Sequence, residues 1–157
     1  MLDGTIIMPL VNFVGESHMT ATARILDWLG EPRSPVGDLV ELTRKGIPYT
    51  TVQRLMEQFQ LDRATLTRIL GTSERTLARR LHQQQPLDLM ESDRLVRFLR
   101  VATYAEEVIE DRDRAIAWLK SPNRALGGQV PIELLDTDAG SEQVVEILTR
   151  IDYGVYS

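Results

Sequence analysis

The sequence contains no cysteine. This absence excludes disulfide bonds, zinc sites built on thiolates and a cysteine nucleophile, and it is compatible with a reducing cytoplasm, where we expect the protein to reside. The 157 residues, of which 43% are hydrophobic, are enough to bury one sizeable core or two small ones. We therefore expect a soluble globular chain.

Long hydrophobic runs are also missing. The most apolar stretch, Thr5–Gly15, is too short to span a membrane, contains Pro9, and follows Asp3 where a secretory signal would carry basic residues. We interpret this stretch as a strand or as an arm that contacts a partner. Met8 and Met19 leave open a later start of translation.

Side chains that usually carry catalysis or hold metal ions are few and poorly spaced. The two histidines, His18 and His82, have no carboxylate or second histidine at metal-ligand spacing. Gly127 and Gly128 lack the other residues of a phosphate-binding loop. Two acidic pairs are interpreted as helix caps and solvated charges: Asp111 with Asp113, and Asp136 with Asp138. We expect no enzyme, no cofactor and no metal.

Charge is distributed unevenly along the chain, whose formal net charge is -5. Residues 1–61 carry 5 basic and 7 acidic side chains, residues 62–100 carry 8 and 5, and residues 101–157 carry 5 and 11. The middle of the chain is therefore at +3, whereas the last third is at -6. A basic middle suits phosphates and an acidic end does not, which indicates two surfaces with different partners. Charge of this kind can also belong to a solvated face.

Helical periodicity dominates the sequence, because apolar residues recur at spacings of three and four and strand alternation is scarce. We expect an all-α protein. In the first half, we expect a helix over 25–29 that stops at Gly30, one from the Ser34 cap and Pro35 to about Gly46, and one that starts at a Thr50–Gln53 capping box. Two short helices follow, one over 63–70 and one that contains Leu77 and Leu81. In the second half, we expect helices over 89–109 and 115–119, a short helix that starts at Pro131, and a last helix over 141–152 with Gly154 as its C-terminal cap.

The two short helices on either side of Gly71 have the geometry of a helix-turn-helix. Asp62 can cap the first of them, Gly71 can take the left-handed conformation that the turn needs, and Thr72 or Ser73 can cap the second. Four leucines can hold the pair against a core: Leu66, Leu70, Leu77 and Leu81.

The second helix of this motif carries the side chains expected to meet DNA. Arginine can read guanine with its planar fork or clamp a phosphate, and hydroxyl groups can donate to phosphate oxygens. The outward residues are Ser73, Arg75, Thr76 and Arg79, with Arg80 facing more towards the DNA backbone. The alternative is an ordinary helical hairpin with a solvated face. Thr67 stands where such motifs usually have alanine or glycine, and Thr72 where an apolar residue is usual.

The sequence ends in an unusual way. Chain termini are usually polar, whereas RIDYGVYS places Tyr153, Val155 and Tyr156 beside the terminal carboxylate. Exposed apolar side chains at this position would need a partner. The alternative is a tail folded back onto its own domain.

Four segments together resemble the Xre-type antitoxins of RES–Xre toxin–antitoxin systems, which share the MbcA/ParS/Xre toxin-binding domain. The segments occur in the order LGTSERTLARRL, WLKSPNRALGG, PIELLDTDAG and RIDYGVYS, and the resemblance covers about residues 36–157. It implies an all-helical protein with an Xre-like DNA-binding part and a small C-terminal part that binds a RES-domain toxin, an enzyme that degrades NAD. It also implies that this chain is not an enzyme, forms a homodimer and represses its own operon.

The resemblance implies roles for particular residues. Arg75, Thr76, Arg79 and Arg80 would contact operator DNA. The toxin-binding residues would be Arg150, Asp152, Tyr153, Gly154, Val155, Tyr156 and Ser157. Residues 1–35 would form an N-terminal arm and first helix with a possible role in dimerisation, residues 36–110 the helix-turn-helix region, and residues 111–157 the toxin-binding domain. Other matching residues are interpreted as core, turns and caps: Trp118, Pro122, Asn123, Gly127, Gly128, Pro131 and Gly140.

Two alternatives stay open. One is an antitoxin that neutralises its toxin without touching DNA, so that the arginines are only solvated. The other is a stand-alone transcription factor whose C-terminal domain binds a different protein.

Overall fold

The computed structural model describes residues 20–30 and 38–154, and every element in these ranges is helical. The elements are α1 (Ala21–Leu29), α2 (Asp38–Lys45), α3 (Tyr49–Phe59), α4 (Arg63–Leu70), α5 (Glu74–His82), α6 (Leu89–Ile109), α7 (Arg112–Leu119), the 3₁₀ turns η1 (Arg124–Leu126) and η2 (Pro131–Leu134), and α8 (Asp138–Asp152). The all-α prediction is confirmed. None of the helices in the described ranges is long and apolar enough to cross a membrane.

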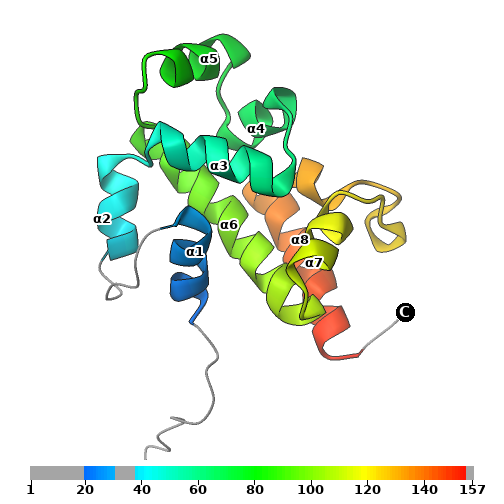
Figure 1. Cartoon of the computed structure of the whole chain (residues 1–157). Coiled ribbons are helices and arrows are strands. Elements are labelled where there is room, and N and C mark those ends of the chain that lie inside the picture. The colour runs from blue at the N-terminus through cyan, green and yellow to red at the C-terminus, as the bar shows by residue number, and fades with distance from the viewer. Residues whose placement is uncertain (1–19, 31–37, 155–157) are drawn as a thin grey trace, which may run out of the picture.

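The long helix α6 organises the molecule. It passes through the middle, with α1 and α2 on one side and α7 and α8 on the other, while α3 crosses it in this view and α5 lies at the opposite end of the view from α7 (Figure 1). It packs against α1, α2, α4, α7 and α8. Its N-terminus is fixed by a capping box, in which Asp88 accepts from the Glu91 N–H and Glu91 accepts from the Asp88 N–H. One helix therefore links the basic middle of the chain to the acidic end.

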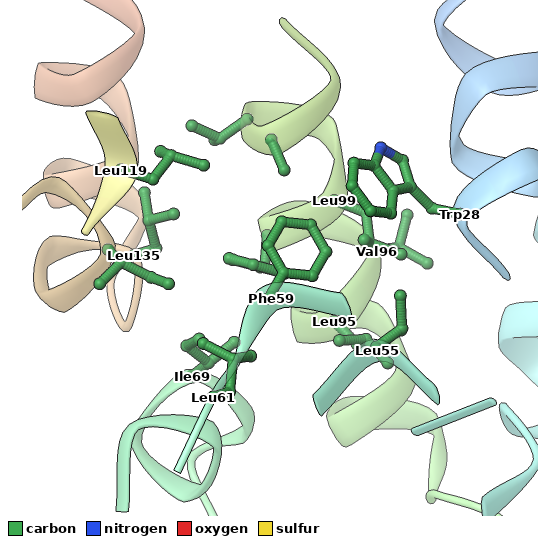
Figure 2. Close-up of a cluster of buried hydrophobic side chains, with 14 of the residues drawn as sticks. Trp28, Leu55, Phe59, Leu61, Ile69, Leu95, Val96, Leu99, Leu119 and Leu135 are labelled. Carbon is green, nitrogen blue, oxygen red and sulfur yellow. The ribbon is translucent and has the colours of Figure 1, made fainter. Parts of the chain in front are cut away.

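An aromatic stack forms the centre of the core. Trp28 of α1 stacks on Phe59 of α3 with 4.4 Å between ring centroids, and Phe59 meets Phe98 of α6 edge-on at 5.0 Å. Leu119 and Leu135, from the C-terminal part, point towards the same cluster (Figure 2). All five side chains are at most 1% exposed. Apolar burial thus joins the N-terminal helix, the helix-turn-helix region and the C-terminal part into one core.

The N-terminal helix belongs to this core rather than to a separate arm. The stripe predicted from Ile25, Leu26 and Leu29 is buried, and α1 stops at Gly30, as predicted; Gly30 takes the left-handed conformation. The Thr5–Gly15 stretch, His18 and the predicted Ser34–Pro35 helix start lie outside the described residues. The end of α2 before Gly46 is confirmed.

Two predicted helix starts are wrong. No Thr50–Gln53 capping box forms, because α3 already begins at Tyr49 with Pro48 in the cap position and no side-chain cap. Proline has no N–H to satisfy, and its fixed φ suits a helix entrance. The last helix begins at Asp138 instead of 141, since Thr137 accepts from the Gly140 N–H at 3.0 Å. Ser141 instead donates to the Thr137 carbonyl.

Candidate functional site

The α4–turn–α5 segment is assembled by local caps and four leucines. Leu66, Leu70 and Leu77 are at most 1% exposed and Leu81 is partly buried against the same core, as predicted. At the N-terminus of α4, Asp62 Oδ1 accepts from the Thr65 N–H at 2.7 Å, and this hydrogen bond lowers the pKa of the Asp62 carboxyl. The predicted Asp62 cap is confirmed.

The turn between the two helices also follows the prediction. Gly71 takes φ +63°, and Ser73, not Thr72, caps α5 by accepting from the Thr76 N–H at 3.1 Å. Ser73 Oγ also donates to Thr76 Oγ1 at 3.0 Å. The unusual Thr67 is buried but satisfied, because its hydroxyl donates to the Ala64 carbonyl at 2.9 Å. The departures from the usual motif therefore leave its geometry intact.

The outer face of α5 presents two free arginines. Arg75 and Arg79 are exposed, and across the described part of the chain neither side chain makes a hydrogen bond or ion pair. They lie four residues apart, which places both on one face of the helix. Ser73 is exposed as well, while Thr76 is half-buried. Two unpaired guanidinium groups and a hydroxyl near a helix N-terminus can bind phosphate or a base edge.

Arg80 does not share this outward position, and the structure corrects its predicted placement. Its side chain is only 18% exposed and turns back towards α6, where Nη2 lies 3.1 Å from Asp88 Oδ2 and Nε lies 2.9 Å from Glu91 Oε2. The sequence shows a third arginine beside Arg79 but not the carboxylates that engage it. The Arg80 guanidinium is thus paired with two carboxylates of its own chain.

Sequence reasoning also missed the residues of α6 that support the motif. Arg94 donates to the carbonyls of Leu70 and Gly71, at 3.0 and 3.4 Å, and so satisfies the C-terminal end of α4. Glu91 is 4% exposed. The spacing of Asp88 and Glu91 is that of a capping box, which is a visible signal for Glu91. No local pattern marks Arg94, because its partners lie 23 and 24 residues earlier in the chain.

The C-terminal end of α8 is open to solvent. Tyr153 is 77% exposed, Asp152 is exposed, and Arg150 pairs with Glu146 one turn earlier. The helix stops at Asp152, and Gly154 follows with φ +67° and its N–H bonded to the Ile151 carbonyl at 3.0 Å. A large aromatic side chain thus stands unpacked beside this helix end. Val155, Tyr156 and Ser157 lie outside the described residues.

The remaining motif residues of the C-terminal part shape its loops. Asn123 Oδ1 accepts from the Ala125 N–H at 2.9 Å, and the Asn123 N–H donates to the Gln129 carbonyl. Gly127 and Gly128 both take positive φ in this turn, as their predicted role requires. Trp118 is only partly buried against the core. Asp111 caps α7 by accepting from the Arg114 N–H at 2.7 Å, and Asp138 pairs with Arg97.

A second feature of this part is a shallow groove between α6 and α8. It has a volume of about 520 Å³, and its lining combines two apolar residues, Val101 and Val145, with charged residues that include Arg100, Glu142 and Glu146. Val145 is 37% exposed. Across residues 20–30 and 38–154, no group of three or more histidine, aspartate or glutamate side chains is placed to hold a metal ion.

Two family models match the chain. The model described as the antitoxin Xre-like helix-turn-helix domain matches residues 38–100, and the model described as the antitoxin Xre/MbcA/ParS C-terminal toxin-binding domain matches residues 105–154. The boundary between the two matches falls near the end of α6. The first match contains α4, α5 and their support on α6, and the second contains α7, α8 and Tyr153.

Similar proteins are known over most of the chain. Antitoxin Xre of Photorhabdus laumondii is 30% identical, with 90% of this chain and 96% of the relative covered. The Prs ADP-ribosylating antitoxin of a Sphingobium species is 26% identical, with 79% and 83% covered. A chain in the crystal structure of the M. tuberculosis MbcT–MbcA toxin–antitoxin complex is 26% identical, with a TM-score of 0.46 and 69% and 96% covered.

Proposed function

Since this chain belongs to the Xre family of antitoxins, we propose that it blocks a RES-domain toxin with the C-terminal end of α8 and represses its own operon through α5. For the first activity the decisive observation is Tyr153, which is 77% exposed within the segment matched by the toxin-binding model. For the second it is the unpaired pair Arg75 and Arg79 within the segment matched by the helix-turn-helix model.

The toxin we propose is one that consumes NAD. The Sphingobium relative is named an ADP-ribosylating antitoxin, and ADP-ribosylation uses NAD as the donor of the ADP-ribosyl group. The name of this relative supports a partner that uses NAD. Two reactions would consume NAD: its hydrolysis, and transfer of its ADP-ribosyl group to a target. Measuring free NAD together with ADP-ribosylated protein in cells that express the partner toxin tells the two reactions apart.

The inhibitory element is the end of the chain. Tyr153 follows the last helix, and the sequence adds Val155 and Tyr156. Two aromatic side chains can fill an apolar pocket of the toxin. Tyrosine is a frequent anchor residue in interfaces, since it combines a large apolar ring with a hydroxyl group.

Truncation after Asp152 tests this element. Tyr153 and Gly154 are exposed, so we expect the melting temperature and DNA affinity of the truncated protein to be unchanged. Co-expression with the cognate toxin should no longer protect cells, and NAD should fall. If the truncated protein still neutralises fully, inhibition comes from the surface of residues 118–150, for which the α6–α8 groove is the nearest candidate.

Alanine at Arg75 and at Arg79 tests the DNA-binding face. We expect each substitution to weaken binding to a palindromic site upstream of the gene by about 1 to 3 kcal/mol where the side chain reads a base, without unfolding the protein. Wild-type affinity should fall steeply with salt, because released counterions drive phosphate binding. Arg114→Ala is the matched control, since Arg114 is an exposed arginine on α7. Unchanged operator shifts in both α5 variants would reject DNA recognition through this face, whereas a wild-type protein that shifts no operator would mean an antitoxin that acts without DNA.

A palindromic operator implies a dimer. A helix-turn-helix reads two half-sites about one helical turn apart, so two copies of α5 are needed. We propose that the N-terminal half supplies the contact, with Ile6–Val14 as a contributor. Light scattering at micromolar concentration should give the mass of two chains, and a variant without residues 1–18 tests the contribution of that stretch. A monomer at all concentrations would contradict dimerisation.

A further inference from the structure

Helix α5 has few apolar contacts to fix its orientation. Leu77 is its only buried residue, and Leu81 is partly buried. A helix of nine residues held mainly at one point can roll about its own axis, which would change the direction of Arg75 and Arg79. A second anchor is therefore needed if these side chains are to meet DNA in one register.

Arg80 provides that second anchor. Its guanidinium donates to the Pro86 carbonyl at 3.2 Å and to Asp88 Oδ2 at 3.1 Å, and its Nε lies 2.9 Å from Glu91 Oε2. The Nε–H does not point along a hydrogen bond, so the Arg80–Glu91 attraction is chiefly electrostatic. All three partners lie in the α5–α6 connection or in the cap and first turn of α6.

Glu91 is the fixed end of this anchor. Its side chain is 6% exposed, and Oε2 also accepts from the Asp88 N–H at 2.9 Å. The carboxylate thus serves the capping box of α6 and the guanidinium of Arg80 at once. A buried carboxylate in an apolar surrounding is costly unless a cation and hydrogen bonds satisfy it, and removing its partner leaves an uncompensated charge. Since α6 is the central helix of the core, Glu91 ties α5 to the most constrained element.

We propose that Arg80 and Glu91 are positioning residues, which set the angle at which α5 presents Arg75 and Arg79 to DNA, and that Arg80 itself makes no contact with DNA. This inference rests on the DNA binding proposed above. Of the three arginines of α5, Arg75 and Arg79 would bind DNA, and Arg80 would orient the helix.

Two variants isolate the pair. Glu91→Gln retains an oxygen that can complete the capping box but removes the charge opposite Arg80. Arg80→Met retains most of the apolar stem but removes the guanidinium. We expect each to weaken specific operator binding by about tenfold, and the double variant to be no weaker than either single one, because the two residues act as one unit. Toxin neutralisation should stay at the wild-type level.

The salt dependence of DNA binding distinguishes positioning from contact. If Arg80 touches a phosphate, Arg80→Met makes the plot of log affinity against log salt less steep, with the magnitude of its slope lowered by about one. If Arg80 only orients α5, the slope equals that of the wild type while affinity falls. An unchanged affinity in Glu91→Gln, or a lowered slope in Arg80→Met, would overturn the proposal.

Hydrogen exchange of the free protein provides a readout that does not depend on DNA. The amides of α5 should exchange faster in Glu91→Gln and Arg80→Met than in the wild type, with α3 and α8 unchanged. Unchanged exchange in α5 would overturn the positioning role whether or not the protein binds DNA. A wild-type protein that binds no operator, combined with faster exchange in both variants, would reject the proposed repression but retain the anchor.

Discussion

Gly71 and Gly127 have nearly the same left-handed backbone, with φ of +63° and +66°, but different surroundings. A side chain at Gly71 would collide with the guanidinium of Arg94, whereas nothing lies within 4 Å of the corresponding position at Gly127. The comparison separates the conformational requirement for glycine from a requirement for space.

Alanine at both positions tests this difference. We expect Gly127→Ala to cost about 1 kcal/mol of unfolding free energy for the left-handed conformation alone. Gly71→Ala should cost about 1 kcal/mol more, since Arg94 must leave the carbonyls that it satisfies. Denaturant titration measures both values. In an Arg94→Met background the two glycine substitutions should cost the same, and a persistent excess at Gly71 would contradict the explanation.

Single residues also show where sequence reasoning reaches its limit. Ser73 and Asp62 are recognisable as caps because a cap depends on neighbours three residues away. The outward direction of Arg75 and Arg79 follows from helical period in the same way. Arg80 has the same chemistry, but its direction is decided by two carboxylates eight and eleven residues further on, which no local pattern connects to it.

At the scale of elements, α4, the first helix of the helix-turn-helix, is capped by the charged side chain of Asp62. The pKa of Asp62 is lowered chiefly by the hydrogen bond from the Thr65 N–H. A carboxyl with a lowered folded-state pKa contributes stability above its ordinary value, and this contribution is lost as pH falls through the folded-state pKa.

Substitutions at Asp62 test the pH dependence. The difference in melting temperature between the wild type and Asp62→Ala should be complete at pH 7 and shrink below about pH 4, because the protonated carboxyl is a weaker acceptor. Asp62→Asn keeps an uncharged hydrogen-bond acceptor. The difference in melting temperature between Asp62→Asn and Asp62→Ala should therefore not change with pH in this range. Calorimetry from pH 7 to pH 2.5 measures both, and a pH-independent effect of Asp62→Ala would exclude the charged cap.

The helices whose boundaries follow from sequence are those with unambiguous local signals. Helix α4 between Asp62 and Gly71 and the long α6 are found where periodicity and caps predict them. The start of helix α3 was missed by two residues because Pro48 and Thr50 both suit a helix start, and tertiary packing chooses between them. Helix α8 starts early because Gly140 fits against the Leu134 backbone, where a side chain would collide.

At the scale of the whole molecule, α1 is more important than sequence suggested. Trp28 is 1% exposed and stacks on Phe59, while the Arg112 guanidinium lies 3.6 Å from the Trp28 ring and pairs with Asp27. Contacts between residues more than 80 positions apart leave no trace in local periodicity. The helix-turn-helix region and the toxin-binding part are therefore stabilised by one shared core.

Removal of the Trp28 ring tests the shared core. We expect Trp28→Ala to cost about 3 to 5 kcal/mol of unfolding free energy, because a fully buried aromatic leaves a cavity. Trp118→Ala is the matched control and should cost less, since Trp118 is only partly buried. Probes in both halves of the protein should report one cooperative unfolding transition, and its midpoint should lie at a lower urea concentration in Trp28→Ala than in the wild type. If only probes in the N-terminal half report unfolding at a lower urea concentration, the two halves are independent folding units.

The central claim is that one chain binds two partners at separate surfaces. Helix α5 and the end of α8 lie far apart in the molecule (Figure 1), and the positive middle and negative end of the sequence correspond to them. The chain's charge pattern predicted this division, although only the structure shows which arginines are free.

Hydrogen exchange of the protein alone, with operator DNA and with its toxin tests this claim most directly. We expect DNA to protect peptides that contain Ser73–Arg79 and to leave Ile147–Gly154 unchanged. Toxin should protect Ile147–Gly154 and leave α5 unchanged. Protection of α5 by the toxin, or protection of the same peptides by both partners, would contradict the two-surface account.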